Sequence, residues 1–205
     1  MNNFDFIAPF YDRLSKLIFG KAIISAQTAY LTDIRQGGNV LILGGGTGWI
    51  LRAVTAINPT CRIWYIDASS KMIALSKQAA AGSQNPVIFI HGTENSIPDS
   101  VSFDAVITNF YLDLFLPASC DDAIKRIRVH IHSGTVWLVS DFIDTTWWHG
   151  AMLRVMYAFF RTVSGIKTGR LCNWERLLQQ NGLQEDRSTR FYGGFIKSAA
   201  FRLRA

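Results

Sequence analysis

The chain has few of the features that mark secreted, metal-binding or disordered proteins. It contains three cysteines among 205 residues, and 18% of its residues are charged. The cysteines are odd in number and scattered, without the paired spacing of a metal site. We therefore expect no metal and a reducing compartment, the cytoplasm. The amino terminus lacks a basic stretch leading into an apolar run, so we expect no signal peptide.

Long apolar runs are also missing. The most apolar long segment, residues 151–163, is interrupted by Arg154 and Arg161 and is too short to span a bilayer. Hydrophobic residues nevertheless make up 49% of the chain, which allows a sizeable core and excludes a disordered chain. Because no repeat, low-complexity tract or break in composition divides the sequence, we predict that residues 1–205 form one domain.

The balance of charge is basic, with a formal net charge of +6. Such a balance suits an acidic substrate, a nucleic acid or an anionic membrane surface, and an ordinary solvated surface explains it as well. The basic residues are spread rather than blocked, and no dedicated RNA-binding module is recognisable. Nucleic acid is therefore the less favoured partner, and peripheral membrane contact stays open.

The most informative motif is an apolar strand, residues 40–43, that runs into a glycine-rich turn. The turn consists of Gly44, Gly45, Gly46, Thr47 and Gly48. Glycines at alternate positions let the chain turn tightly and let a ligand lie against the backbone. A dinucleotide fingerprint would want a third glycine at position 49, where Trp49 stands. The motif alone predicts either a ligand cradle or only a turn.

The next elements favour the ligand interpretation. Residues 50–57 predict a helix, and residues 61–66 predict an apolar strand with Asp67 at its carboxyl end. An acid at this point of a strand–helix–strand unit can accept hydrogen bonds from both ribose hydroxyls of an adenosine ligand. The alternative is that Asp67 caps the following helix, residues 70–79.

Strands and helices continue to alternate, which predicts an α/β protein with a mostly parallel sheet and helices on both faces. The further strands are expected at residues 87–90, 103–108 and 135–139, and the further helices at 14–34, 119–130, 147–163 and 173–181. Two closing segments, 183–191 and 195–203, meet at residues 192–194 and predict an antiparallel hairpin.

These motifs resemble those of the class I S-adenosylmethionine-dependent methyltransferases. The resemblance rests on residues 40–48, 65–73, 91–98 and 102–112, in the family's order, and on 6–12, which is similar to the amino-terminal segment of the ubiquinone/menaquinone-biosynthesis branch. It implies a doubly wound, seven-stranded, Rossmann-like sheet, with the hairpin as its antiparallel edge. It also implies S-adenosylmethionine as cofactor.

By family position, the resemblance implies a set of cofactor-binding residues. They are Tyr11, Gly44, Gly45, Gly46, Thr47, Gly48, Asp67, Ala68, Met72, Thr93, Glu94, Asn109 and Phe110. For Tyr11, packing against the first helix is the alternative. Two positions depart from the family pattern, because Ile42 and Thr93 stand where many members carry an acid. A non-catalytic member of the fold is therefore an alternative.

Methyl transfer depends on aligning two reactants and excluding water, so a general base is not always needed. The catalytic candidates are Tyr111, in the turn after the fourth strand, where an aromatic face can contact a cation, and His149, as a general base. For Tyr111, a core position at the strand end is the alternative. Asn109 begins Asn-Phe-Tyr-Leu, which lacks the Asn-Pro-Pro-Tyr pattern of many amino-group methyltransferases.

Two segments flank the sheet in this prediction, a helical segment over residues 1–36 and a helical insertion over residues 144–170. The helix expected at 147–163 is apolar on more than one face and must therefore cover an acceptor, a second subunit or a membrane surface. We predict that it supplies the acceptor pocket, and a buried core helix or a dimer contact is the alternative. We predict a monomeric or homodimeric methyltransferase that acts on a small, aromatic or lipophilic acceptor. The alternatives are an RNA or protein methyltransferase and a non-catalytic cofactor-binding protein.

Overall fold

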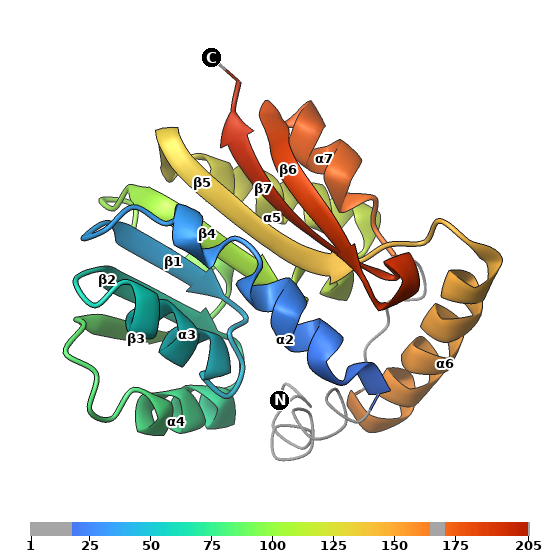
Figure 1. Ribbon diagram of the computed structural model, residues 1–205, viewed down its shortest axis with the longest axis horizontal. Coiled ribbons are helices and arrows are strands. Elements are labelled where there is room, and N and C mark those ends of the chain that lie inside the picture. Colours follow the sequence, from blue (N-terminus) through green and yellow to red (C-terminus); the bar gives the residue numbers. More distant parts are fainter. Residues whose placement is uncertain (1–17, 165–170, 205) are drawn as a thin grey trace.

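The computed structural model of the chain describes residues 18–164 and 171–204, with side chains described for 18–156 and 171–204. One sheet, in the order β3-β2-β1-β4-β5-β7-β6, carries the seven described strands (Figure 1). The strands are β1 (Asn39–Leu43), β2 (Arg62–Asp67), β3 (Val87–His91), β4 (Phe103–Asn109), β5 (Ile131–Phe142), β6 (Leu183–Phe191) and β7 (Ile196–Leu203). Strands β1 to β5 pair in parallel, and β7 pairs antiparallel with both β5 and β6. The predicted fold class is confirmed.

Helices cover both faces of the sheet. They are α2 (Lys21–Thr28), α3 (Trp49–Ile57), α4 (Ser70–Ala79), α5 (Pro117–Arg128), α6 (Trp147–Ser164) and α7 (Trp174–Gln180), with short 3-10 turns η1 (Leu31–Asp33), η2 (Glu94–Ser96), η3 (Leu112–Leu114) and η4 (Tyr192–Gly194). Helices α3 and α4 pack on one face and α5 and α7 on the other, while α6 extends beyond the carboxyl end of β5 (Figure 1).

The apolar run of β1 is buried on both sides because successive side chains of a strand point to opposite faces. Val40 and Ile42 pack in the core beneath α3 and α4, and Leu41 and Leu43 pack in the core beneath α5 and α7. Ile42 is therefore a core residue. At this position, where the family pattern has an acid, the chain places an apolar side chain in an apolar site.

The helix expected over residues 14–34 is wrong at its carboxyl end, since α2 stops at Thr28 and the chain turns through η1. Contacts with the edge strand β6 explain the difference. The Tyr30 hydroxyl lies 2.7 Å from that of Thr189, and Arg187 pairs with Asp33 at 2.6 Å. These contacts draw residues 30–33 onto the sheet edge instead of continuing the helix.

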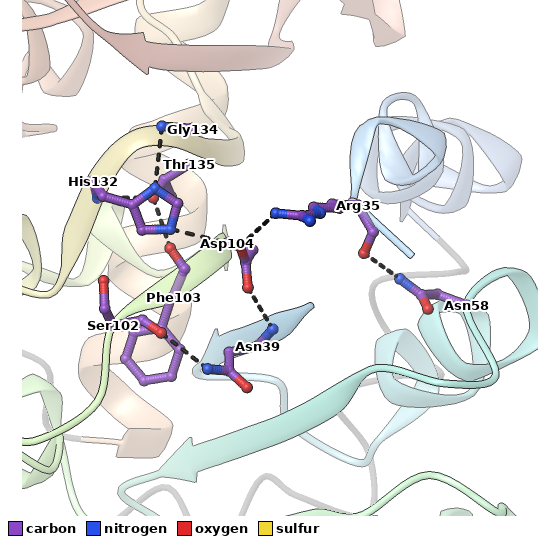
Figure 2. Close-up of polar contacts among 9 residues, drawn as sticks. All are labelled: Arg35, Asn39, Asn58, Ser102, Phe103, Asp104, His132, Gly134 and Thr135. Carbon is purple, nitrogen blue, oxygen red and sulfur yellow. Dashed lines mark hydrogen bonds and ion pairs between the residues drawn. The ribbon is translucent and has the colours of Figure 1, made fainter. Parts of the chain in front are cut away.

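Polar contacts join the starting ends of the parallel strands (Figure 2). Asp104 of β4 accepts a hydrogen bond from the backbone nitrogen of Asn39 at 2.8 Å and pairs with Arg35 at 4.0 Å and with His132 of β5 at 3.5 Å. One carboxylate thus ties together β1, β4 and β5 at this end, and leaves the opposite, carboxyl end for the glycine turn.

None of the helices described for the chain combines the length and apolar character needed to cross a membrane.

Candidate active site

Three glycines after β1 adopt left-handed backbone, with φ of 64° at Gly44, 63° at Gly46 and 89° at Gly48. Their surroundings differ. A Cβ atom on Gly44 would lie 2.6 Å from the Tyr111 ring, and one on Gly48 would lie 2.8 Å from the Ser76 backbone of α4. A Cβ atom on Gly46 would meet nothing within 4 Å among the described residues. Gly44 and Gly48 are therefore required by packing, whereas Gly46 faces open space in which a ligand can approach the backbone.

Tyr65 of β2 contacts this turn with both its hydroxyl and its ring. Its hydroxyl donates to the carbonyl oxygen of Gly46 at 2.8 Å, and a Cβ atom on Gly45 would lie 2.5 Å from its ring. Sequence reasoning missed Tyr65 as a functional residue. The available signal was a tyrosine inside a predominantly apolar strand, because a buried hydroxyl needs a hydrogen-bond partner.

Asp67 lies at the carboxyl end of β2, directly beside the glycine turn. One carboxylate oxygen accepts from the backbone nitrogen of Gly46 at 3.0 Å, and the other accepts from the backbone nitrogen of Ser69 at 2.9 Å. The capping alternative for Asp67 is wrong, because Ser69 is the residue that caps α4 and accepts from the Met72 nitrogen at 3.2 Å. The acid is thus held against the one turn glycine that faces open space.

Glu94 and Tyr111 form a buried pair beside the turn. The Tyr111 hydroxyl donates to Glu94 at 2.7 Å, while the side chain of Thr93 accepts from the Asn95 nitrogen at the start of η2. Burial, together with the nearby charge of Glu94, raises the pKa of Tyr111. The hydroxyl therefore stays protonated, and the geometry favours a role in supporting Gly44 over one in proton transfer. The catalytic role of Tyr111 stays a prediction.

The turn after β4 has strained backbone and an unpaired donor. Phe110 has a φ of 50°, which is uncommon for a bulky residue. The Asn109 side-chain nitrogen is buried and has no hydrogen-bond partner among the described residues. Strained conformations cluster at ligand sites, and a buried donor without a partner costs about 1–3 kcal/mol. Both features suit a turn that contacts a ligand.

His149 lies on α6, packed against the rings of Trp148 and Phe195 at centroid distances of 4.2 and 5.3 Å. Its Nδ1 accepts from the backbone nitrogen of Thr145 at 3.2 Å, and its buried Nε2 has no partner in the described part of the chain. The neutral ring therefore carries its proton on Nε2 and offers a donor there. This tautomer is unfavourable for the predicted general base, and that role stays a prediction.

Burial varies along α6 over the residues whose side chains are described. Trp148 and Met152 pack against a cluster that contains Phe110, Phe142 and Phe195. In the same helix, the Trp147 side chain is 86% exposed and the Val155 side chain is 68% exposed. The side chains of residues 157–163, which the sequence also assigned to an apolar helix, lie outside the described part.

A cavity of about 540 Å³ lies between the β5–α6 connection, α6 and the start of α7. Its lining mixes apolar and charged groups and includes Asp144, Leu153, Arg154, Cys172, Trp174 and Glu175. The aromatic cluster and this cavity adjoin, because Leu153 and Leu171 belong to both. The predicted acceptor pocket therefore has two adjoining candidate places in the structure.

The structure brings most of the sequence-predicted residues to one end of the sheet. The residues at or after the carboxyl ends of β1 to β4 are Gly44, Gly45, Gly46, Thr47, Gly48, Asp67, Ala68, Thr93, Glu94, Asn109, Phe110 and Tyr111, with Met72 in the first turn of α4. In this group the Ala68 carbonyl lies 3.0 Å from His91 Nε2. His149 stands apart on α6, and Tyr11 lies outside the described residues.

Known proteins resemble this chain in sequence and in fold. Residues 40–134 match the family model of the methyltransferase domain. The release factor glutamine methyltransferase of Caulobacter vibrioides is 33% identical over 95 residues, which is 45% of this chain and 32% of that protein. The chain thus spans about a third of that relative. The family match supports the class I methyltransferase assignment for this part of the chain and leaves the ubiquinone/menaquinone branch a prediction.

Two solved structures illustrate the likeness in fold. The mitomycin 7-O-methyltransferase MmcR superposes with a TM-score of 0.70 at 15% identity, covering 100% of this chain and 61% of that one. The 1,6-didemethyltoxoflavin-N1-methyltransferase of Burkholderia thailandensis, solved with bound S-adenosylhomocysteine, superposes with a TM-score of 0.73 at 15% identity, covering 99% and 87%. The chain therefore has the Rossmann-like methyltransferase fold.

Proposed function

We propose that this chain is an S-adenosylmethionine-dependent methyltransferase that acts on a small, aromatic or lipophilic acceptor. The observation that carries the proposal is the surroundings of Gly46. This residue has left-handed backbone and faces open space among the described residues. Its carbonyl oxygen accepts a hydrogen bond from the Tyr65 hydroxyl, and its backbone nitrogen donates one to the Asp67 carboxylate. A bare backbone turn next to a fixed carboxylate suits a ligand that has both an amino-acid part and a ribose.

The residues of the turn fit this cofactor. Asp67 would accept hydrogen bonds from the ribose hydroxyls, and the backbone at Gly46 would contact the methionine part. The buried Asn109 amide would find in the ligand the acceptor that it lacks among the described residues. When bound, S-adenosylmethionine supplies a sulfonium methyl group that an acceptor atom can attack in line. The protein holds the two partners in place and excludes water.

The acceptor class rests on the apolar surroundings of the turn after β4. Phe110 contacts Phe142 at a centroid distance of 5.0 Å, and the cluster continues through Phe195 to Trp148 and Met152 of α6. Aromatic rings and methionine suit an adaptable, lipophilic pocket. A core-helix role is the competing explanation, because the same contacts would also anchor α6.

Methylation of a protein is the second candidate. The curated relative acts, by its name, on release factors, and the chain is basic, with a net charge of +6. The Asn-Phe-Tyr-Leu sequence at Asn109 argues against it, because it lacks the pattern of many amino-group methyltransferases. The cofactor proposal is common to both candidates.

Calorimetry tests the cofactor proposal, with S-adenosylmethionine and its demethylated product titrated into the purified chain. We expect saturable binding of both. Absence of binding by a folded chain would leave the methyltransferase fold without its cofactor and would overturn the proposal. If the cofactor binds, mass spectrometry of ligands that co-purify with the chain would identify the class of acceptor to use in a turnover assay.

Paired variants of α6 test the acceptor assignment. Met152→Gln changes a side chain inside the aromatic cluster, whereas Trp147→Gln changes one that is 86% exposed. We expect both variants to bind S-adenosylmethionine and only Met152→Gln to lose turnover of the acceptor. Equal turnover in the two folded variants would assign α6 to packing.

A further inference from the structure

Two thiols meet in the interior, on segments far apart in the chain. Cys120 lies in α5 and Cys172 lies just before α7, 52 positions later, yet their Sγ atoms are 2.7 Å apart. Both side chains are buried. A disulfide bond measures about 2.0 Å, so a shift of less than about 1 Å would bring the two sulfurs to bonding distance.

The two thiols differ in how they can be reached. Both thiols belong to the core beneath α5 and α7, but Cys172 also lines the cavity beside α6 and Cys120 does not. The Cys172 thiol also donates to the carbonyl oxygen of Leu112 at 3.2 Å. A small oxidant that enters the cavity therefore meets Cys172 first, with Cys120 in place as the second thiol.

We infer that Cys120 and Cys172 are a peroxide-oxidisable dithiol site, whose disulfide ties the connection between α6 and α7 to α5. In the first step the Cys172 sulfur attacks hydrogen peroxide, so that an S–O bond forms, the O–O bond breaks and hydroxide leaves as water after protonation. In the second step the Cys120 sulfur attacks the sulfenic sulfur of Cys172, so that the S–S bond forms and the S–O bond breaks. The hydroxide that leaves takes up the proton of the Cys120 thiol and becomes the second water. Two thiols are oxidised, and one peroxide is reduced to two waters.

The surroundings of Cys172 favour the reduced dithiol under ordinary conditions, so we expect the disulfide to form only when peroxide is abundant. The hydrogen bond with Cys120, followed by burial, raises the pKa of the Cys172 thiol. Because the thiolate is the reactive form, oxidation is slow at neutral pH, and the pair stays reduced in a reducing compartment. The inference does not depend on the proposed function, although the disulfide would fix one wall of the cavity.

Cys61 provides an internal control. It is buried as deeply as the pair, donates to the carbonyl oxygen of Asn58 at 3.2 Å and accepts from the Asn85 side chain at 3.3 Å. No second thiol contacts it among the described residues. Burial alone therefore predicts that the three cysteines react equally with peroxide, whereas the dithiol inference predicts that only Cys120 and Cys172 are oxidised.

The test counts alkylated cysteines by mass spectrometry after denaturation. We treat dilute chain with hydrogen peroxide or with a phosphine reductant, remove the reagent, unfold and alkylate. The reduced chain should take up three labels. The peroxide-treated monomer should take up one, at Cys61, should yield a crosslinked peptide that contains Cys120 and Cys172, and should regain three labels after reduction.

Two variants check the order of the steps. In Cys120→Ser, peroxide should leave a sulfenic acid on Cys172 that dimedone traps, and in Cys172→Ser it should leave Cys120 alkylatable. Three labels after peroxide, or irreversible oxidation of either cysteine without the crosslink, would overturn the inference. The label count on the unaltered chain decides the matter even where a serine variant does not fold.

Discussion

Gly46→Ala tests two roles of this glycine separately. One is its left-handed backbone conformation, which affects the stability of the fold, and the other is the space beside it, which affects ligand binding. With a φ of 63° at this position, an alanine pays the left-handed backbone cost of about 1–2 kcal/mol. Its methyl group would meet nothing within 4 Å in the described part of the chain, so no overlap with these residues adds to that cost. For a chain of this size, the melting temperature should fall by about 2–8 °C.

Gly82→Ala is the matched control. Gly82 follows α4, has a φ of 92°, and its Cβ atom would also meet nothing within 4 Å. It lies before β3, at the end of the sheet opposite to the glycine turn. The two variants should therefore lose similar stability, measured by thermal unfolding, for the same backbone reason.

Only Gly46→Ala should lose affinity for S-adenosylmethionine, because only there would the added methyl group occupy the ligand's side of the turn. We expect its dissociation constant to rise at least about tenfold, or about 1.4 kcal/mol, by calorimetry at a temperature where both variants are folded. Equal dissociation constants for Gly46→Ala, Gly82→Ala and the unaltered chain would refute the idea that the turn holds a ligand.

Three further variants test single contacts. Asp67→Ala should weaken S-adenosylmethionine binding by about 1.5–3 kcal/mol, as for a lost charge-assisted hydrogen bond, and unchanged affinity in calorimetry would remove Asp67 from the site. Tyr65→Phe, which loses the bond to the Gly46 carbonyl, should cost about 0.5–1.5 kcal/mol in urea unfolding and also weaken binding; an effect on neither would contradict its supporting role. Burial raises the pKa of Asp113 from 3.8 to about 7, so the folded state holds a proton that the unfolded state releases, and stability should fall as pH rises between these values. Asp113→Asn should flatten that fall in urea unfolding across this range, and an unaltered slope would refute the assignment.

The sequence by itself determined the order of the elements and the positions of the glycine turn and the acid to which we assign the cofactor. Alternation of apolar strands and helices predicted a mostly parallel sheet with helices on both faces, and the glycines after residue 43 and the acid at Asp67 marked the ends of β1 and β2. These predictions succeed because they depend on local properties, namely strand periodicity, glycine conformation and the parallel pairing of consecutive strands. Boundaries were less certain, since contacts with β6 ended α2 before residue 30.

Tertiary structure alone decided what each of these residues contacts. The three left-handed glycines look alike in sequence, yet Gly44 is covered by Tyr111 and Gly46 is open. The Tyr65 bond to Gly46, the Glu94 bond to Tyr111 and the meeting of Cys120 with Cys172 join residues that are 17 to 52 positions apart. Such contacts depend on strand register and on how helices pack across the sheet, and no local pattern in the chain encodes them.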